Sequence, residues 1–211
     1  MNILIADDHN VVRRGLQQII ATRPGWRVGA EVSASDDVLP ALRRERFDVV
    51  ILDVSLGAGR SGIDLLSHIR AEFPTLRSLV LSMHAEEHYA LRCLRAGASG
   101  YIQKDSSPEQ LLAAIDRVAS GRTYISAAMA DQLADAAVRG YDSALAHERL
   151  STREFEVFRL IAMGTSPTAI AEKLQLSIKT VSTYRSRILE KMGFQSNADV
   201  VAYSIRNRLI E

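Results

Sequence analysis

Val49-Val50-Ile51-Leu52-Asp53 is a run of apolar, largely β-branched residues that ends abruptly in a carboxylate. A short apolar run bounded by turn residues predicts a strand that is buried on both faces. Asp53 then lies at the carboxyl end of this strand, where open α/β sheets bind their ligands. From this stretch alone, Asp53 could equally well be a ligand-binding residue or only the first residue of the glycine-rich loop that follows. The residues at the ends of the other strands decide between these two interpretations.

The first part of the chain alternates short apolar runs with helical patterns, five times over. The predicted strands are residues 3–6, 27–32, 49–53, 78–82 and 100–103, and the predicted helices are residues 11–21, 36–45, 63–72, 87–96 and 108–120. The last helix has its own start signal, because Ser107 and Gln110 form a capping box around Pro108. This alternation predicts an α/β fold with a parallel sheet and helices on both faces.

Length and composition set outer bounds on the protein. A chain of 211 residues fits two compact units. Its net charge of +1 gives no indication of nucleic-acid binding, so any basic patch must be local. Cys93 is the only cysteine, which excludes an intramolecular disulfide. There is no signal-peptide pattern and no apolar run of ~18 residues, so we expect a cytoplasmic protein without a membrane partner.

Polar side chains follow four of the predicted strands. Strand 3–6 is followed by Asp7 and Asp8, and the later strands end in Asp53, Ser82 and Lys104. A parallel sheet gathers these ends on one edge, where three carboxylates repel one another unless a cation lies among them, and oxygen ligands suit Mg²⁺. Each residue has an ordinary alternative, such as helix capping for an aspartate or solvation for the lysine. The presence of polar residues at the ends of four strands together favours a cation-binding site.

These residues resemble the receiver domain of bacterial response regulators, over roughly residues 1–121. The motif residues are Asp7, Asp8, Asp53, Ser82, Tyr101 and Lys104, together with the run Ala-Gly-Ala-Ser-Gly-Tyr-Ile-Gln-Lys at residues 96–104. The resemblance implies a flavodoxin-like fold with strand order 2-1-3-4-5. It also implies that a partner histidine kinase phosphorylates Asp53.

The resemblance further implies a role for each motif residue. The implied Mg²⁺ ligands are Asp7, Asp8, Asp53 and the backbone carbonyl of Ser55. Lys104 would pair with the phosphoryl group, Ser82 would move to hydrogen-bond it, and Tyr101 would turn inward behind it. A receiver usually has a short, proline-containing loop after the acceptor, whereas the loop here is longer, rich in glycine and free of proline.

Two other motifs compete on this stretch. Three glycines match the pattern G-x-G-x-x-G: Gly57, Gly59 and Gly62. A dinucleotide-binding fingerprint should directly follow the first strand and should have an acidic residue about 20 positions later, and neither requirement is met here. The segment from His84 to His88 resembles a zinc-protease box, but alanine stands where the catalytic glutamate must follow the first histidine. Neither pattern is therefore favoured.

The second part of the chain has no strand pattern. Residues 122–147 predict a linker with a helical segment at 125–138 and a turn at 139–143. Residues 148–211 predict four short helices that begin near Ser151, Ser166, Ser177 and Ser196. Two helices joined by a tight turn, the second polar and basic on one side, predict a helix-turn-helix DNA-binding domain.

The third of these helices separates into two faces when it is projected at 100° per residue. Val181, Ile188 and Met192, with Ile178 close by, are expected to face the core. Hydroxyl and basic side chains lie opposite, and residues 177–191 have a net charge of +3. A solvated amphipathic helix shows the same pattern, so the projection alone leaves both interpretations open.

Similarity to a second family favours DNA binding. Leu150-Ser151-x-Arg153-Glu154, followed by Ser177-x-Lys179-Thr180-Val181 and further matching positions, resembles the LuxR-type DNA-binding domain across most of residues 148–210. Tyr184 stands where a histidine is frequent. The predicted DNA-contact residues are Lys179, Thr180, Ser182, Thr183, Tyr184, Ser186 and Arg187.

Together the two domains resemble a NarL/FixJ-type response regulator, an acceptor protein rather than an enzyme. This implies a homodimer on an inverted DNA repeat, a cognate histidine kinase or phosphorelay protein, and RNA polymerase as a further candidate partner. One rival hypothesis is a Mg²⁺-dependent phosphohydrolase with Asp53 as nucleophile and His9 as the nearest histidine in sequence. The other is a DNA-binding protein whose first domain is a dimerisation scaffold independent of phosphorylation.

Overall fold

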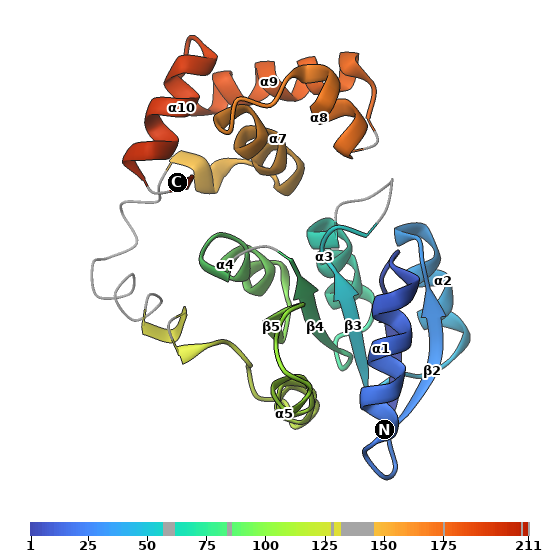
Figure 1. Cartoon of the computed structure of the whole chain (residues 1–211). Helices are drawn as coiled ribbons and strands as arrows, with labels where there is room; N and C mark the ends of the chain where they lie inside the picture. Colours follow the sequence, from blue (N-terminus) through green and yellow to red (C-terminus); the bar gives the residue numbers. More distant parts are fainter. Residues whose placement is uncertain are drawn as a thin grey trace. The chain divides into compact units, whose positions relative to one another are not determined.

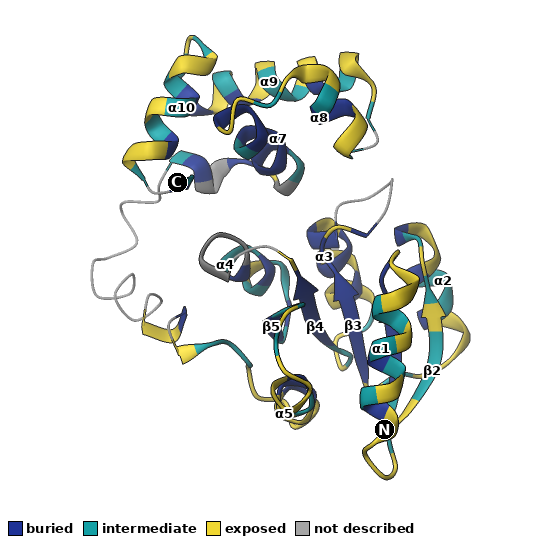
Figure 2. Cartoon of the chain, in the orientation of Figure 1, coloured by how far each residue is buried: buried dark blue, intermediate teal, exposed yellow. Residues whose placement is uncertain are grey.

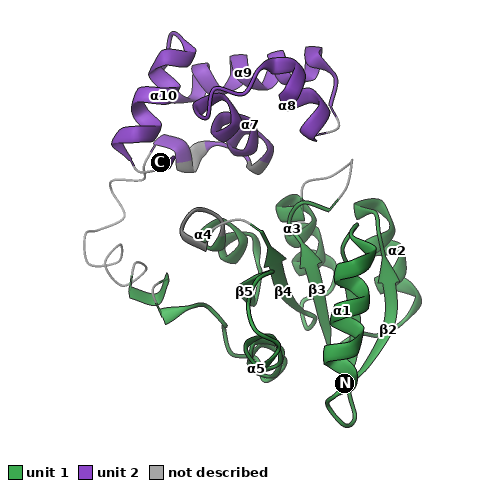
Figure 3. Cartoon of the chain, in the orientation of Figure 1, with its two compact units in different colours: residues 1–135 green, residues 136–211 purple. Residues whose placement is uncertain are grey.

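The chain forms two compact units, Met1–Asp135 and Ala136–Glu211 (Figure 3). The computed structural model describes residues 1–56, 62–83, 86–127, 129–131, 146–174, 176–207 and 209–210. The first unit contains a sheet and the second is helical. The domain limits predicted at residues 121 and 147 stay predictions.

The first unit is built on a five-stranded parallel sheet in the order β2-β1-β3-β4-β5 (Figure 1). The strands are β1 (Asn2–Ala6), β2 (Arg27–Val32), β3 (Val49–Asp53), β4 (Arg77–Ser82) and β5 (Gly100–Gln103). The helices are α1 (Asn10–Ala21), α2 (Ser35–Arg44), α3 (Gly62–Glu72), α4 (Glu86–Ala96) and α5 (Pro108–Ala119). The predicted order and all ten elements are confirmed, with ends that differ by at most one residue.

The central strand β3 is buried throughout, as its sequence predicts (Figure 2). Val49 and Ile51 pack on one face against apolar side chains of α1 and α5. Val50 and Leu52 point to the other face, as alternation along a strand requires, and are also fully buried. Full burial of each such side chain stabilises the fold by roughly 1.5–3 kcal/mol. Asp53 therefore lies at the end of a strand that is packed on both faces.

The outer edge of β5 is covered by the segment that follows α5. The amide of Tyr101 donates to the carbonyl of Tyr124 at 2.9 Å, and the amide of Tyr124 donates to the carbonyl of Ser99 at 3.1 Å. These two bonds form a short parallel bridge between Gly100 and Tyr124. A Cβ atom at Gly100 would lie 3.0 Å from Tyr124, so the close approach requires glycine here.

In its described residues, the second unit contains a short 3-10 helix, η2 (Ala146–Arg149), and four α-helices. These are α7 (Thr152–Ala162), α8 (Pro167–Leu174), α9 (Ile178–Met192) and α10 (Asn197–Arg206), which confirms the four predicted helices. The capping box predicted for α5 is formed, and α7 begins with a second one, between Ser151 and Glu154. Phe155 and Phe158 stack at the centre of the core, and Gly193 ends α9 in the left-handed conformation at φ 67°.

One core prediction for α9 is wrong. Val181, Ile188 and Met192 are buried as expected, but Ile178 is 52% exposed. Ile178 is the first residue of the helix, directly after the N-cap residue Ser177, whose side chain accepts from the amide of Thr180. A projection gives the angle of a residue around the helix, but not whether a neighbouring element extends far enough to cover it.

Several predictions fall on residues outside the described part of the chain. These are Gly57 and Gly59 of the glycine-rich loop, His84 of the zinc-box resemblance, most of the predicted helix at 125–138, and the turn at 139–143. Among the described helices, none is both long enough and apolar enough to cross a membrane.

Candidate acidic site and nucleic-acid interface

The carboxyl ends of the parallel strands bring the predicted polar residues to one edge of the sheet. Asp7 directly follows β1, and Asp53 and Ser82 are the last residues of β3 and β4. Lys104 directly follows β5, and its amide donates to the carbonyl of Ser82 at 2.8 Å. Residues far apart in the sequence thus converge because their strands share one direction.

Lys104 bridges the two buried carboxylates. Its Nζ lies 2.6 Å from Oδ2 of Asp53 and 2.7 Å from Oδ2 of Asp7. The three side chains are only 6%, 1% and 2% exposed, respectively. One ammonium group therefore faces two carboxylates away from bulk water, which leaves one negative charge in excess before Asp8 is counted.

Burial and this ion pair act in opposite directions on the titration of the site. Burial raises the pKa of the Asp53 carboxyl, and the contacts with Lys104 and the Ser55 amide offset that rise only in part. Burial also opposes the charged form of Lys104, but its hydrogen bonds to Asp53 and Asp7 outweigh this and raise the Lys104 pKa. The site therefore keeps a charged lysine and favours any further cation that neutralises its carboxylates.

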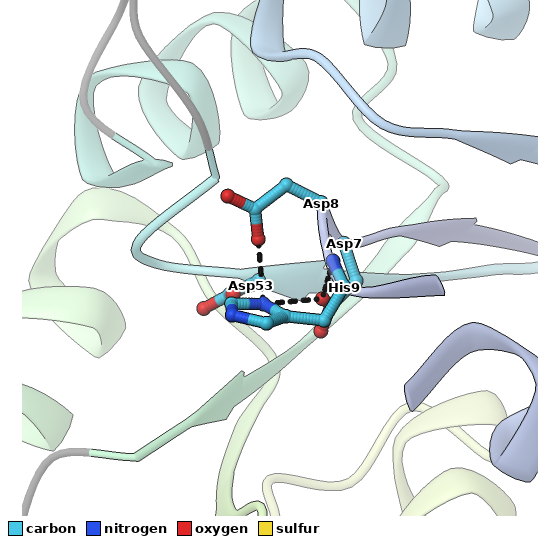
Figure 4. Close-up of side chains that lie close together, drawn as sticks. All are labelled: Asp7, Asp8, His9 and Asp53. Atoms are coloured by element: carbon cyan, nitrogen blue, oxygen red, sulfur yellow. Dashed lines mark hydrogen bonds and ion pairs between the residues drawn. The ribbon is translucent and has the colours of Figure 1, made fainter. Parts of the chain in front are cut away.

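A third carboxylate and a histidine complete the acidic site (Figure 4). Ligand atoms of Asp7, Asp8, His9 and Asp53 all lie within 4.8 Å of one another. Nδ1 of His9 is 2.7 Å from Oδ1 of Asp8 and 3.2 Å from Oδ1 of Asp7. Asp8 is 35% exposed, so a cation has access from solvent. Three carboxylates this close with a single ammonium group fit a hard divalent cation such as Mg²⁺.

Helix capping does not account for the aspartate pair. The N-cap residue of α1 is His9, and no side chain caps this helix. Oδ1 of Asp7 instead accepts the backbone amide of His9 at 2.8 Å, which fixes the turn that leaves β1. This turn places the His9 ring against the acids. The sequence predicts no contact for His9, which is only the histidine nearest to the aspartates along the chain.

The residues that follow Asp53 hold its side chain in place. The amide of Ser55 donates to Oδ1 of Asp53 at 2.9 Å, while Lys104 occupies Oδ2. Gly62, the first residue of α3, lies so close that a Cβ atom there would be 2.7 Å from the carbonyl oxygen of Val54. Both oxygens of Asp53 are therefore oriented, and the role of the Ser55 carbonyl as a metal ligand stays a prediction.

The two predicted switch residues lie beneath the site. Ser82 pairs with Gln103, and Tyr101 pairs with Val80, in the register of β4 and β5. Both side chains are fully buried. Tyr101 is thus a buried core residue in this structure, and its inward turn behind Ser82 on phosphorylation stays a prediction.

The predicted DNA-contact residues share the outer face of α9. Five of them are exposed and two are half-buried: Lys179, Ser182, Thr183, Ser186 and Arg187, then Thr180 and Tyr184. Within the part of the chain that the structure describes, neither Lys179 nor Arg187 pairs with a carboxylate. Unpaired cations on an exposed helix suit the phosphate backbone of DNA, and hydroxyl groups suit base edges.

α9 is anchored to the rest of its unit by two polar contacts that sequence reasoning missed. Lys191 Nζ lies 2.7 Å from Oε2 of Glu154, whose side chain is 3% exposed and belongs to the capping box of α7. Arg185 Nε donates to Oδ1 of Asn197 at 2.7 Å, at the start of α10. Two of the basic residues counted in the +3 patch therefore hold the helix in position instead of facing solvent freely.

Comparisons with known proteins match both units. The response regulator receiver domain matches residues 3–116, and the LuxR family of bacterial regulatory proteins matches residues 148–204. Oxygen regulatory protein NreC of Staphylococcus aureus is 36% identical over 216 residues, with 100% of both chains covered.

Solved structures agree with these matches. RcsB of Salmonella enterica serovar Typhimurium, bound to promoter rprA in the presence of phosphomimetic BeF3-, is 29% identical, with a TM-score of 0.64 over 96% of this chain and 97% of that one. A LuxR-family two-component response regulator from Aurantimonas is 36% identical, with a TM-score of 0.60 over 65% of this chain and 97% of the other.

Proposed function

The chain belongs to the two-component response regulators that join a receiver domain to a LuxR-type DNA-binding domain, and from this premise we propose that phosphorylation of Asp53 controls its binding to specific DNA sequences. The observation that carries the proposal is the Lys104 ammonium group held between Asp53 and Asp7. It places a positive charge where a phosphoryl group would arrive.

The proposed reaction transfers a phosphoryl group to a carboxylate. An oxygen of Asp53 attacks the phosphorus of a phosphohistidine on the kinase, an O–P bond forms, and the N–P bond to the kinase histidine breaks. Mg²⁺, held by Asp7, Asp8, Asp53 and the carbonyl of Ser55, would offset the repulsion between carboxylate and phosphoryl oxygens. Lys104 neutralises charge on the other side and would pair with the new phosphoryl group.

Readout requires a second arrangement of residues near the site. We assign this role to Ser82 and Tyr101, because they lie on adjacent strands that end at the acceptor. Ser82 supplies a neutral hydroxyl that would hydrogen-bond the phosphoryl oxygens, and Tyr101 would fill the space behind it. A local change of charge then biases a two-state packing element.

The DNA-binding half uses the outer face of α9. We propose that Lys179 and Arg187 contact phosphates, while Thr180, Ser182, Thr183, Tyr184 and Ser186 lie toward the bases and sugar backbone. The related RcsB structures include dimers bound to DNA. A homodimer on an inverted repeat is the mode we propose here, because two-fold protein symmetry is matched by operator symmetry.

The test is a genome-wide map of DNA binding in cells in which the kinase is active, for wild type, Asp53→Ala and the control Asp64→Ala. Asp64 is an exposed carboxylate on α3, outside the acidic site. We expect specific sites to be lost in Asp53→Ala alone. Equal maps for all three proteins would refute control by phosphate and favour a receiver that acts only as a dimerisation scaffold.

A parallel measurement separates the proposal from the phosphohydrolase alternative. The purified protein is incubated with Mg²⁺ and acetyl phosphate, and the phosphoryl group on Asp53 is quantified by mass spectrometry. We expect at most one phosphoryl group per chain and only slow release. Sustained turnover of phosphomonoesters that is lost in Asp53→Ala would instead identify an enzyme.

A further inference from the structure

A polar cavity lies at the edge of the sheet opposite the acidic site. It has a volume of about 330 Å³ and is lined by the start of β4, the turn between α4 and β5, and the segment after α5. Arg70, Arg77 and Arg122 all contribute to its wall. They come from three separate segments, so neither helical nor strand periodicity groups them in the sequence.

No acidic side chain is among the twelve described residues that line this cavity. Elsewhere in the same unit, arginines at four positions pair with carboxylates at 2.6–3.2 Å: Arg13, Arg23, Arg27 and Arg43. Within the described chain, the three cavity arginines have no such ion pair. Their guanidinium groups repel one another unless an anion lies among them.

Local structure positions each of these arginines. Gly97 adopts φ 111°, and a Cβ atom there would lie 2.5 Å from Cδ of Arg70, so glycine makes room for the arginine stem. Arg77 is the first residue of β4, and its guanidinium lies 3.5 Å from the Cβ position of Gly121. Arg122 Nε donates to the Ser120 hydroxyl at 3.2 Å.

Backbone groups around the cavity are largely occupied and leave the guanidinium groups as the main donors. The amides of Gly97, Ala98, Ser99 and Gly121 all donate to backbone carbonyls. The described lining contains no aromatic residue that could stack on a base or a sugar. The volume is near the lower end of the roughly 300–1,000 Å³ typical of small-molecule sites.

We infer that this cavity binds a compact phosphorylated anion. Guanidinium forks match phosphoryl oxygens in a bidentate manner, and three arginines from separate segments in one cavity wall suit a group with several terminal oxygens. The cavity is separate from the proposed acceptor site, because Arg77 is the first residue of β4 and Ser82, at the acceptor site, is the last.

The test titrates the full-length protein, without divalent cations, with pyrophosphate as the probe and citrate as a carboxylate comparison. Binding is followed by amide chemical shifts at about 0.15 M salt, which screens exposed charges beyond about 8 Å. We expect saturable shifts at Ser99 and Thr123, and tighter binding of pyrophosphate than of citrate. Absence of saturable binding, or tighter binding of citrate, would overturn the inference.

Variants localise the effect. Arg70 and Arg122 are exposed, so Arg70→Gln and Arg122→Gln should fold, and each should weaken pyrophosphate binding by about tenfold or more, the loss of one charge-assisted contact. The control is Arg14→Gln, which removes an exposed charge from α1 in the same unit. Equal affinities for all the proteins, or an equal loss in Arg14→Gln, would show that no such site exists.

Discussion

Replacing Lys104 by methionine removes the ammonium group from the acidic site and nearly preserves the length of the side chain. Asp53 and Asp7 then remain buried, at 1% and 2% exposure, without a positive partner. Breaking a buried ion pair by removing one partner typically costs about 3–5 kcal/mol. A domain is stable by only about 5–15 kcal/mol, so the first unit should stay folded but lose much of its margin.

Tryptophan fluorescence can measure this loss in the full-length chain. Trp26 is the only tryptophan and packs against the core of the first unit, with the guanidinium carbon of Arg23 5.6 Å from its ring centroid. Urea unfolding followed by Trp26 fluorescence therefore reports the first unit alone. We expect the free energy of unfolding to fall by about 3–5 kcal/mol without Mg²⁺, and Arg14→Gln to stay near wild type.

Added Mg²⁺ supplies the second half of this test. A cation that binds only the folded state stabilises it by mass action, and it should bind more strongly once the competing ammonium group is gone. Mg²⁺ should therefore restore more stability to Lys104→Met than it adds to wild type. An unchanged unfolding midpoint without Mg²⁺, or an equal gain for both proteins, would refute the reasoning about the bridged carboxylates.

Three other substitutions test separate parts of the structure. Glu154→Gln should destabilise the α7–α9 contact by about 1–3 kcal/mol, measured by hydrogen exchange. Burial opposes ionisation of Glu154, but its Lys191 and capping contacts lower its pKa below the ordinary 4.5. The ionised Glu154 therefore contributes fully to the free energy of unfolding above pH 4.5, and this contribution is lost as the pH falls through the lower pKa of the folded state. The stability of Glu154→Gln should not show this loss in acid. Gly62→Ala would place Cβ 2.7 Å from a backbone carbonyl oxygen behind β3, so it should cost about 1–3 kcal/mol and slow phosphorylation by acetyl phosphate, whereas Gly15→Ala, with nothing within 4 Å, should do neither. Lys179→Ala should reduce the slope of log affinity against log salt for DNA by about one, and an unchanged slope would remove Lys179 from the phosphate contacts.

The sequence was most informative where burial is complete. An apolar run closed by Asp53 predicted the central strand within its observed limits, because a strand covered on both faces leaves no polar position inside it. Parallel direction then predicted which residues share an edge, and Asp7 and Lys104 do lie beside Asp53. Strand order came from the family resemblance and is confirmed.

The sequence pattern could not predict the contacts between individual side chains. No spacing rule shows that one ammonium group bridges both Asp7 and Asp53, or that the His9 ring lies against Asp8, because these contacts depend on rotamers and on the turn after β1. The sequence pattern did not predict the arginine cavity either, because its three arginines come from segments that are far apart along the chain. Ile178 was misplaced because helical periodicity does not show where a packing partner ends.

The bridge between Tyr124 and β5 affects how recombinant fragments of this protein should be cut. A fragment that stops at residue 121 would lack Tyr124 and would lose two backbone hydrogen bonds, to the Ser99 carbonyl and the Tyr101 amide on either side of Gly100. The outer edge of β5 would then be exposed, with unpaired backbone groups that can pair with a strand of a neighbouring molecule. Isolated versions of the regulatory half should therefore retain the chain to at least residue 131, and premature truncation should show itself as self-association in light scattering.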